Sequence, residues 1–121
     1  MKKTNKNSII KIQGKLDSAC AIHVGTILEY AIENRISCVI LDFTRVLEFE
    51  YSAMALLKEV LAFYQKDFSQ ITCRGLSKDT VHIFRELGVG RIPGVRIVAP
   101  DRHTEKKPIG ITLFLTKILY C

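Results

Sequence analysis

The run CVILDF at residues 38–43 constrains the fold of this chain more than any other segment. It is an almost unbroken series of apolar and β-branched residues, without the polar and apolar alternation that marks a half-exposed strand. Runs of this kind are typical of strands in parallel sheets, which are covered on both faces. We therefore expect residues 38–43 to form an interior strand of a mostly parallel sheet.

Segments with strand and helix character alternate along the chain. Short runs rich in β-branched residues predict further strands, at about residues 8–13, 70–74 and 95–98. Apolar residues at helical spacing predict three helices, at about residues 18–34, 53–65 and 77–88. Because right-handed crossovers join successive strands in such an order, the chain is predicted to have an α/β fold. The expected sheet is small and mostly parallel, with four to five strands flanked by three to four helices.

The length of 121 residues is that of a single domain, which we expect to span residues 1–121. Its core is expected at about residues 8–98, and residues 99–121 are expected to form a polar loop and an apolar closing segment. Two structures are open for that closing segment. Helical spacing favours a helix with one apolar side, formed by Phe114, Leu115, Ile118 and Leu119. A strand over residues 111–115 agrees with the pattern nearly as well.

The formal net charge of +6 is basic, and part of it lies in two clusters that flank the core, at Lys2, Lys3, Lys6, Arg102, Lys106 and Lys107. No aromatic residues are interleaved with these clusters and no known motif accompanies them, so we expect no nucleic-acid partner. Without a secretory signal at its start, the chain is expected to be cytoplasmic. Its longest apolar segment, residues 109–121, is too short to span a bilayer, so no membrane insertion is expected.

The sequence lacks the usual patterns for metal or cofactor binding. Its four cysteines form no CxxC pair and have no histidine at a zinc-ligand spacing; they are Cys20, Cys38, Cys73 and Cys121. The glycines of residues 88–94 follow a predicted helix and precede a strand, which is the reverse of a dinucleotide-binding fingerprint. We therefore expect no metal and no cofactor.

Catalysis is equally without support. A nucleophilic hydroxyl needs a base beside it, and none of the three histidines, His23, His82 and His103, can be placed next to Ser52 from the sequence. We expect the protein not to be an enzyme. The less favoured alternative is a small enzyme or ligand-binding domain that uses Asp42 and Ser52 at the edge of the sheet, where ligands of open α/β sheets bind.

The segment EFEYSAMALLKE, residues 48–59, places a serine at the start of the second predicted helix. Ser52 is expected to be the N-cap, since serine is among the commonest residues there. The same helix start would accommodate a phosphate on Ser52, because its amides are unpaired and its dipole end is positive. Loops after the first two strands open on one edge of a parallel sheet, so Asp17 and Ser52 are expected to lie close together. With an exposed Met54 and Lys58, this edge would form a docking face for another protein.

Three segments, in this order, resemble the STAS domain family, which includes anti-sigma factor antagonists and the cytoplasmic domains of sulfate transporters. They are IIKIQGKLDSA, ISCVILDFTRVLEFEYSAMALL and ITCRGLSKDTVHIFRELGVGRI. The resemblance covers about residues 8–98. In the antagonist branch a serine within an Asp-Ser-Ser-Gly turn is phosphorylated, and Ser52 matches that phosphoacceptor. Asp17 matches an acidic residue of the family's first loop, whereas Glu50, Tyr51 and Ala53 replace the Asp, the first Ser and the Gly.

The resemblance implies a non-catalytic protein-interaction switch. Its partner would be an anti-sigma factor with serine kinase activity, and ATP would be bound by that partner. Phosphorylation of Ser52 would release the partner. The implied partner-binding residues are Asp17, Glu50, Tyr51, Ala53, Met54 and Lys58. The alternative within the family is a STAS subunit of a lipid-transport or stress-sensing complex that works without phosphorylation.

Overall fold

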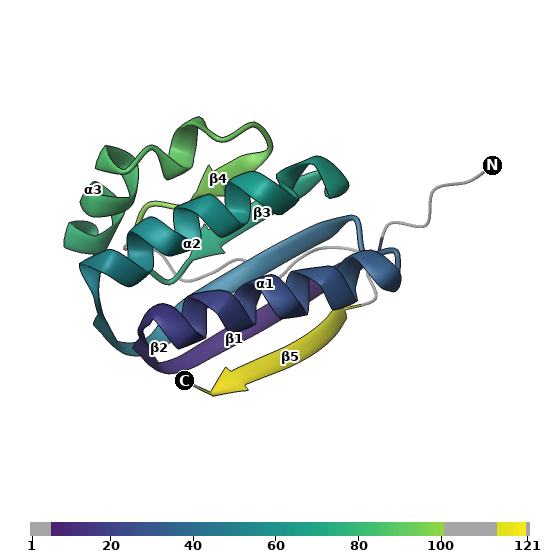
Figure 1. The fold of residues 1–121 in the computed structure, drawn as a ribbon, viewed down its shortest axis with the longest axis horizontal. Coiled ribbons are helices and arrows are strands. Elements are labelled where there is room, and N and C mark those ends of the chain that lie inside the picture. The colour runs from purple at the N-terminus through teal and green to yellow at the C-terminus, as the bar shows by residue number, and fades with distance from the viewer. Residues whose placement is uncertain (1–5, 101–113, 121) are drawn as a thin grey trace.

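The computed structural model describes residues 6–100 and 114–120. Strands and helices alternate along the chain (Figure 1): β1 (Asn7–Leu16), α1 (Ser18–Glu33), β2 (Cys38–Phe49), α2 (Tyr51–Tyr64), β3 (Gln70–Arg74), α3 (Lys78–Glu86), β4 (Val95–Ile97) and β5 (Phe114–Tyr120). Two short 3₁₀ helices, η1 (Gln65–Asp67) and η2 (Val89–Arg91), follow α2 and α3. The predicted α/β fold with a small parallel sheet and three helices is confirmed.

The five strands lie in the order β4-β3-β2-β1-β5, and all of the neighbouring pairs are parallel. From β1 to β4, each strand is added on the same side of the previous one. Right-handed crossovers that always step in one direction place their helices on the same face of the sheet. Figure 1 shows this arrangement, with α1 and α2 side by side across the sheet.

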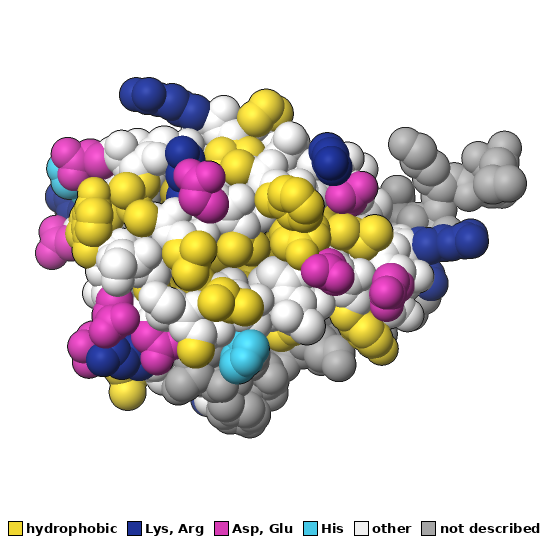
Figure 2. Space-filling view, in the orientation of Figure 1, with side chains coloured by type: hydrophobic (Ala, Val, Ile, Leu, Met, Phe, Trp, Pro, Cys, Tyr) yellow, Lys and Arg dark blue, Asp and Glu magenta, His cyan; other side chains and the backbone are white. Residues whose placement is uncertain are grey.

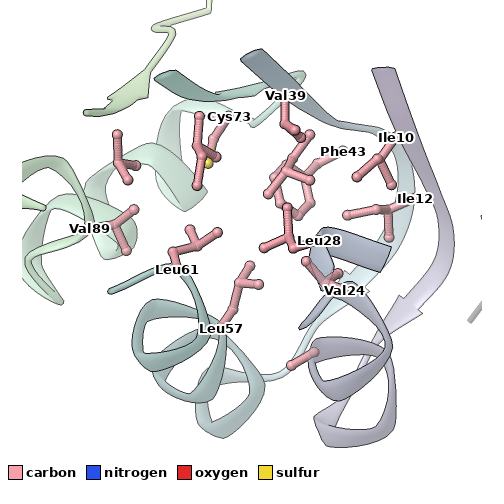
Figure 3. Packing of buried hydrophobic residues seen from close by; sticks show 14 of the residues in the cluster. Ile10, Ile12, Val24, Leu28, Val39, Phe43, Leu57, Leu61, Cys73 and Val89 are labelled. Atoms are coloured by element: carbon pink, nitrogen blue, oxygen red, sulfur yellow. The ribbon is translucent and has the colours of Figure 1, made fainter. Parts of the chain in front are cut away.

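The hydrophobic core lies between this face and the helices. In β2 the helix-facing residues Val39, Leu41 and Phe43 are fully buried. They pack in one cluster with apolar residues of α1 and α2, among them Leu28 and Leu57 (Figure 3). These contacts explain why the apolar residues of α1 and α2 occur at helical spacing: they form the face of each helix that packs against the sheet.

We expected β2 to be covered on both faces, but the described helices α1, α2 and α3 cover only one of them. Cys38, Ile40 and Asp42 alternate with the buried residues and are only partly buried. The run CVILDF is continuous in apolar character, but its burial has the two-residue period of a strand with one helix-covered face. The one-directional strand order explains this, because it leaves no helix among α1, α2 and α3 to cover the other face.

The closing segment is a strand where the structure describes it. Residues 114–120 form β5, which pairs with β1 from Asn7↔Phe114 to Gln13↔Tyr120. The helical interpretation of this segment is therefore wrong. The predicted strand over residues 111–115 is confirmed for residues 114–115, and the observed strand continues beyond it to Tyr120. The predicted polar loop, the basic residues Lys2, Lys3, Arg102, Lys106 and Lys107, and residues 111–113 lie outside the described residues.

Candidate functional site

The starts of α1 and α2 lie next to each other at the carboxyl edge of the sheet. The pairing of β1 with β2 continues to Leu16↔Phe49, and the backbone N–H of Glu50 donates to the carbonyl of Leu16 at 3.0 Å. Both chains then turn at once into helices, α1 at Ser18 and α2 at Tyr51. The expected proximity of the two helix starts is therefore confirmed.

Asp17 has a defined structural role at this edge. It is the N-cap of α1, and its Oδ1 accepts a hydrogen bond from the backbone N–H of Cys20 at 2.9 Å. A carboxylate at this position satisfies one of the unpaired amides of the first turn and interacts favourably with the helix dipole. The acidic residue of the first loop thus orients α1 beside α2.

The prediction that Ser52 is the N-cap of α2 is wrong. The N-cap is Glu50, whose backbone is extended and whose side chain makes no capping hydrogen bond, so Ser52 is the second residue of the helix. The reason is that β2 runs to Phe49, well past the predicted end at Phe43, and its pairing with β1 keeps the backbone extended up to Glu50. The Ser52 side chain is exposed, and its hydroxyl makes no hydrogen bond with any residue that the structure describes.

The other residues predicted to bind a partner divide into exposed and buried ones. Tyr51 is 63% exposed, and Lys58 is partly exposed and pairs with Glu59 at 3.3 Å. Met54 is only 2% exposed and Ala53 is fully buried, so the prediction of an exposed Met54 is wrong. Met54 belongs to the inward face of α2 because its spacing to the buried Leu57 is one helical turn.

Leu47 is a further candidate, which the sequence pattern alone does not single out. It lies near the end of β2 and is 90% exposed, the highest value among the large apolar residues described. Its position follows from the extension of β2 beyond Phe43. Leu47 and Tyr51 flank residues 48–50, which form the end of β2 and the N-cap of α2, so two exposed apolar side chains lie close in sequence to Ser52.

Charged residues lie at this junction between β2 and α2. The Lys15 ammonium group contacts Glu50 at 3.2 Å and Glu48 at 3.6 Å. The hydrogen bond to Glu50 and the negative charge of Glu48 raise the pKa of Lys15. Two carboxylates and one ammonium leave a net negative charge next to the start of α2.

A match to a family model assigns the chain. The model of the STAS domain matches residues 1–105, which is most of the sequence. The chain belongs to the STAS domain family. STAS domains are generally non-catalytic and have protein-interaction or regulatory roles. Neither the curated proteins nor the solved structures gave a significant match.

Two further observations concern the described residues. In the described part of this STAS domain, no helix is long and apolar enough to cross a membrane. Within the same residues, no cluster of three or more His, Cys, Asp or Glu side chains could hold a metal ion.

The alternative of a catalytic or ligand site that joins Asp42 with Ser52 is not supported by the geometry. Asp42 was expected at the end of its strand, but β2 continues to Phe49, which places the strand end about 20 Å further along. The Asp42 side chain also points to the face opposite the helices. Asp42 and Ser52 therefore belong to different parts of the STAS domain.

Asp42 instead forms hydrogen bonds with Thr44, and Gly75 packs closely against both residues. Its Oδ1 accepts hydrogen bonds from the Thr44 hydroxyl at 2.5 Å and the Thr44 backbone N–H at 3.0 Å. Gly75, at the end of β3, has a φ of +78°. A Cβ on Gly75 would lie 2.6 Å from the Thr44 nitrogen and 2.8 Å from Asp42 Oδ1. Only glycine allows the two strands to approach this closely.

Replacing Gly75 with alanine should therefore lower the free energy of unfolding by about 2 to 3 kcal/mol, from backbone strain and steric overlap together. The control is Gly88→Ala, because Gly88 has a φ of +89° but nothing within 4 Å of an added Cβ. Gly88→Ala should lower the free energy of unfolding by only about 1 kcal/mol. Urea unfolding of both variants measures the difference, and an equal loss for the two would show that the Asp42–Thr44 contact does not require a glycine.

Proposed function

We propose that this STAS domain is a phosphorylation-dependent interaction switch of the anti-sigma antagonist type. Unphosphorylated, it binds an anti-sigma factor that is also a serine kinase, and phosphorylation of Ser52 releases that partner. The domain acts in the cytoplasm, and ATP is bound by the kinase. The observation that carries the proposal is the exposed hydroxyl of Ser52, without a partner among the described residues, in the first turn of α2.

The position of Ser52 suits a phosphoacceptor better than an N-cap position would. An N-cap hydroxyl is engaged with the backbone amides of its own helix, whereas the Ser52 hydroxyl is available to a kinase. Ser52 also lies where the backbone N–H groups of a helix start are unpaired. A phosphate there would be stabilised by those groups and by the helix dipole.

The surface around Ser52 suits protein binding. Leu47 and Tyr51 are exposed apolar residues close to it in sequence, and Figure 2 shows hydrophobic side chains gathered along the face formed by α1 and α2. The exposed apolar residues of these helices are Ile22, Tyr30, Tyr51 and Phe63. Such exposed apolar groups beside charged ones are common in interaction surfaces.

Phosphorylation would change the charge of this surface strongly. A phosphoserine adds about −1.5 to −2 charges at neutral pH. This charge would join the carboxylates of Glu48 and Glu50, which Lys15 neutralises only in part. A partner that docks on a weakly charged surface would then meet a strongly negative one, and we expect it to dissociate.

Incubation with ATP and the cognate anti-sigma kinase should add one phosphate, and mass spectrometry should locate it on Ser52. The variant Ser52→Ala should block the modification. Ser18→Ala is the matched control, because Ser18 is also an exposed serine in the first turn of a helix at the same edge. It should be phosphorylated as the wild type is.

Two outcomes would contradict the switch. Phosphate on Ser18 rather than Ser52 would show that the kinase recognises the other helix start. No phosphate at all, with a kinase that is active on another substrate, would favour the alternative, a STAS subunit of a lipid-transport or stress-sensing complex without phosphorylation. The observation that favours this alternative is the exposed phenol of Tyr51, a bulky group directly before Ser52.

A further inference from the structure

A cavity of about 320 Å³ opens on the sheet face opposite the helices. Its lining comes from three adjacent strands: Lys11 and Ile12 of β1, Asp42, Thr44 and Arg45 of β2, and Arg74 of β3. The strand register explains why the charged residues meet there. Lys11 pairs with Asp42 and Asp42 pairs with Arg74, so the three residues form one row across the sheet.

Asp42 is the only carboxylate among the described lining residues, and it is already engaged. Asp42 Oδ1 accepts two hydrogen bonds from Thr44, and Arg74 Nη2 lies 3.4 Å from Asp42 Oδ2. Burial acts to raise the pKa of Asp42, but the hydrogen bonds from Thr44 and the charge of Arg74 outweigh it, so the pKa is lowered. Asp42 is therefore ionised at neutral pH and is the counter-ion of Arg74.

The other two cations have no counter-ion within the described ranges 6–100 and 114–120. Neither Lys11 nor Arg45 forms an ion pair or a side-chain hydrogen bond with the residues that the structure describes. Lys11, Arg45 and Arg74 carry three positive charges against the one negative charge of Asp42, so the cavity has a net charge of about +2. Like charges held around one cavity raise the electrostatic potential inside it and attract anions.

We propose that this cavity binds the phosphate group of a small phosphate monoester or of inorganic phosphate, through Lys11 and Arg45. A phosphate monoester carries about two negative charges at neutral pH, which would neutralise the excess. Its oxygens match the fork of N–H donors on arginine and the ammonium group of lysine. The cavity volume is at the lower end of the range for small-molecule sites, about 300 to 1,000 Å³, and leaves room for a small organic group beside the phosphate.

This site is independent of the proposed switch. Ser52 lies at the carboxyl edge of the sheet in α2, whereas the cavity lies on the sheet face that α1, α2 and α3 do not cover. A negative result for the cavity would therefore not contradict the proposed switch at Ser52, and the reverse also holds.

The test is a titration of the full chain with inorganic phosphate and with glycerol phosphate, at constant ionic strength and pH 7, followed by backbone amide NMR. We expect saturable shifts centred on the amides of Lys11, Arg45 and Arg74. Tighter binding of glycerol phosphate would identify a phosphorylated metabolite as the ligand. Equal binding of the two would identify the phosphate ion itself.

A charge-matched pair of variants separates the site from general attraction. The double variant Lys11→Gln/Arg45→Gln should bind phosphate at least about tenfold more weakly, because two charged hydrogen-bond donors are removed. The control Arg91→Gln/Arg96→Gln removes two exposed arginines outside the cavity. Its affinity for phosphate should stay within about twofold of that of the wild type. The wild-type shift map needs no variant, so the test holds even if one variant does not fold.

The proposal would be overturned by either of two results. One is the absence of saturable shifts in the wild type up to about 50 mM phosphate, a concentration that would reveal even very weak sites. The other is an equal loss of affinity in the two double variants, which would mean that phosphate responds only to net charge.

Discussion

Replacing Phe43 with alanine should lower the free energy of unfolding by about 3 to 5 kcal/mol, the range for large aromatic residues in a core. Phe43 is 1% exposed and lies on the helix-facing side of β2, the central strand of the sheet. Its ring centroid is 5.8 Å from that of Phe84 in α3 and 6.0 Å from that of Phe49. Alanine would remove these ring contacts and leave a cavity where β2 and α3 meet.

Phe63→Ala is the control for this prediction. Phe63 is also an aromatic residue, but it is 66% exposed on α2, where its ring contacts Tyr64 and Lys66. Its loss should cost less than about 1 kcal/mol. Urea unfolding of both variants, compared at similar m-values, gives the two differences. Equal costs would mean that the core does not lie between β2 and the helices.

Much of the fold follows from local patterns. The predicted strands 70–74 and 95–98, the helix from 77 to 88 and the start of the strand at residue 38 appear at nearly their predicted places. Local chemistry fixes the ends of the last helix, since Ser77 accepts a hydrogen bond from the N–H of Thr80 and Gly88 has a left-handed backbone. Patterns of this kind depend only on residues close in sequence.

Features that depend on distant residues could not be predicted. The length of β2 beyond Phe43 results from its pairing with β1, which no local pattern records. The position of α1, α2 and α3 on the same face of the sheet results from the order of the strands. The apolar character of Cys38 and Ile40 therefore suggested a second covering layer of helices that the described elements do not supply.

The candidate site was predicted in part. The neighbouring starts of α1 and α2 follow from the parallel α/β order alone. The start of α2 was misplaced because a serine is a good N-cap, and here the extension of β2 overrides that preference. The sequence does contain a signal for the burial of Met54, since Met54, Leu57 and Leu61 have the spacing of one helix face.

The cavity on the sheet face opposite α1, α2 and α3 was not predicted at all. Lys11, Arg45 and Arg74 lie on three different strands, and only the register of the sheet brings them together. Single lysines and arginines in strands are common, so nothing in the local sequence marks these three residues as neighbours.

The variant Ser52→Asp should weaken binding to the cognate anti-sigma kinase by about ten- to a hundredfold. A negative charge would then be added to the proposed docking surface, within four residues of Glu48 and Glu50 in the sequence, and like charges brought together at an interface cost affinity. The control is Ser69→Asp, which adds the same charge at an exposed serine preceding β3, at the opposite edge of the sheet. Ser69→Asp should bind within about twofold of the wild type.

Calorimetric titration of the kinase with wild-type protein, Ser52→Asp and Ser69→Asp is therefore the most direct test of the switch. The proposed function predicts that only Ser52→Asp loses affinity, with all three proteins showing the same circular dichroism spectrum. Equal affinity of Ser52→Asp and the wild type, or equal losses in the two variants, would contradict a switch at Ser52.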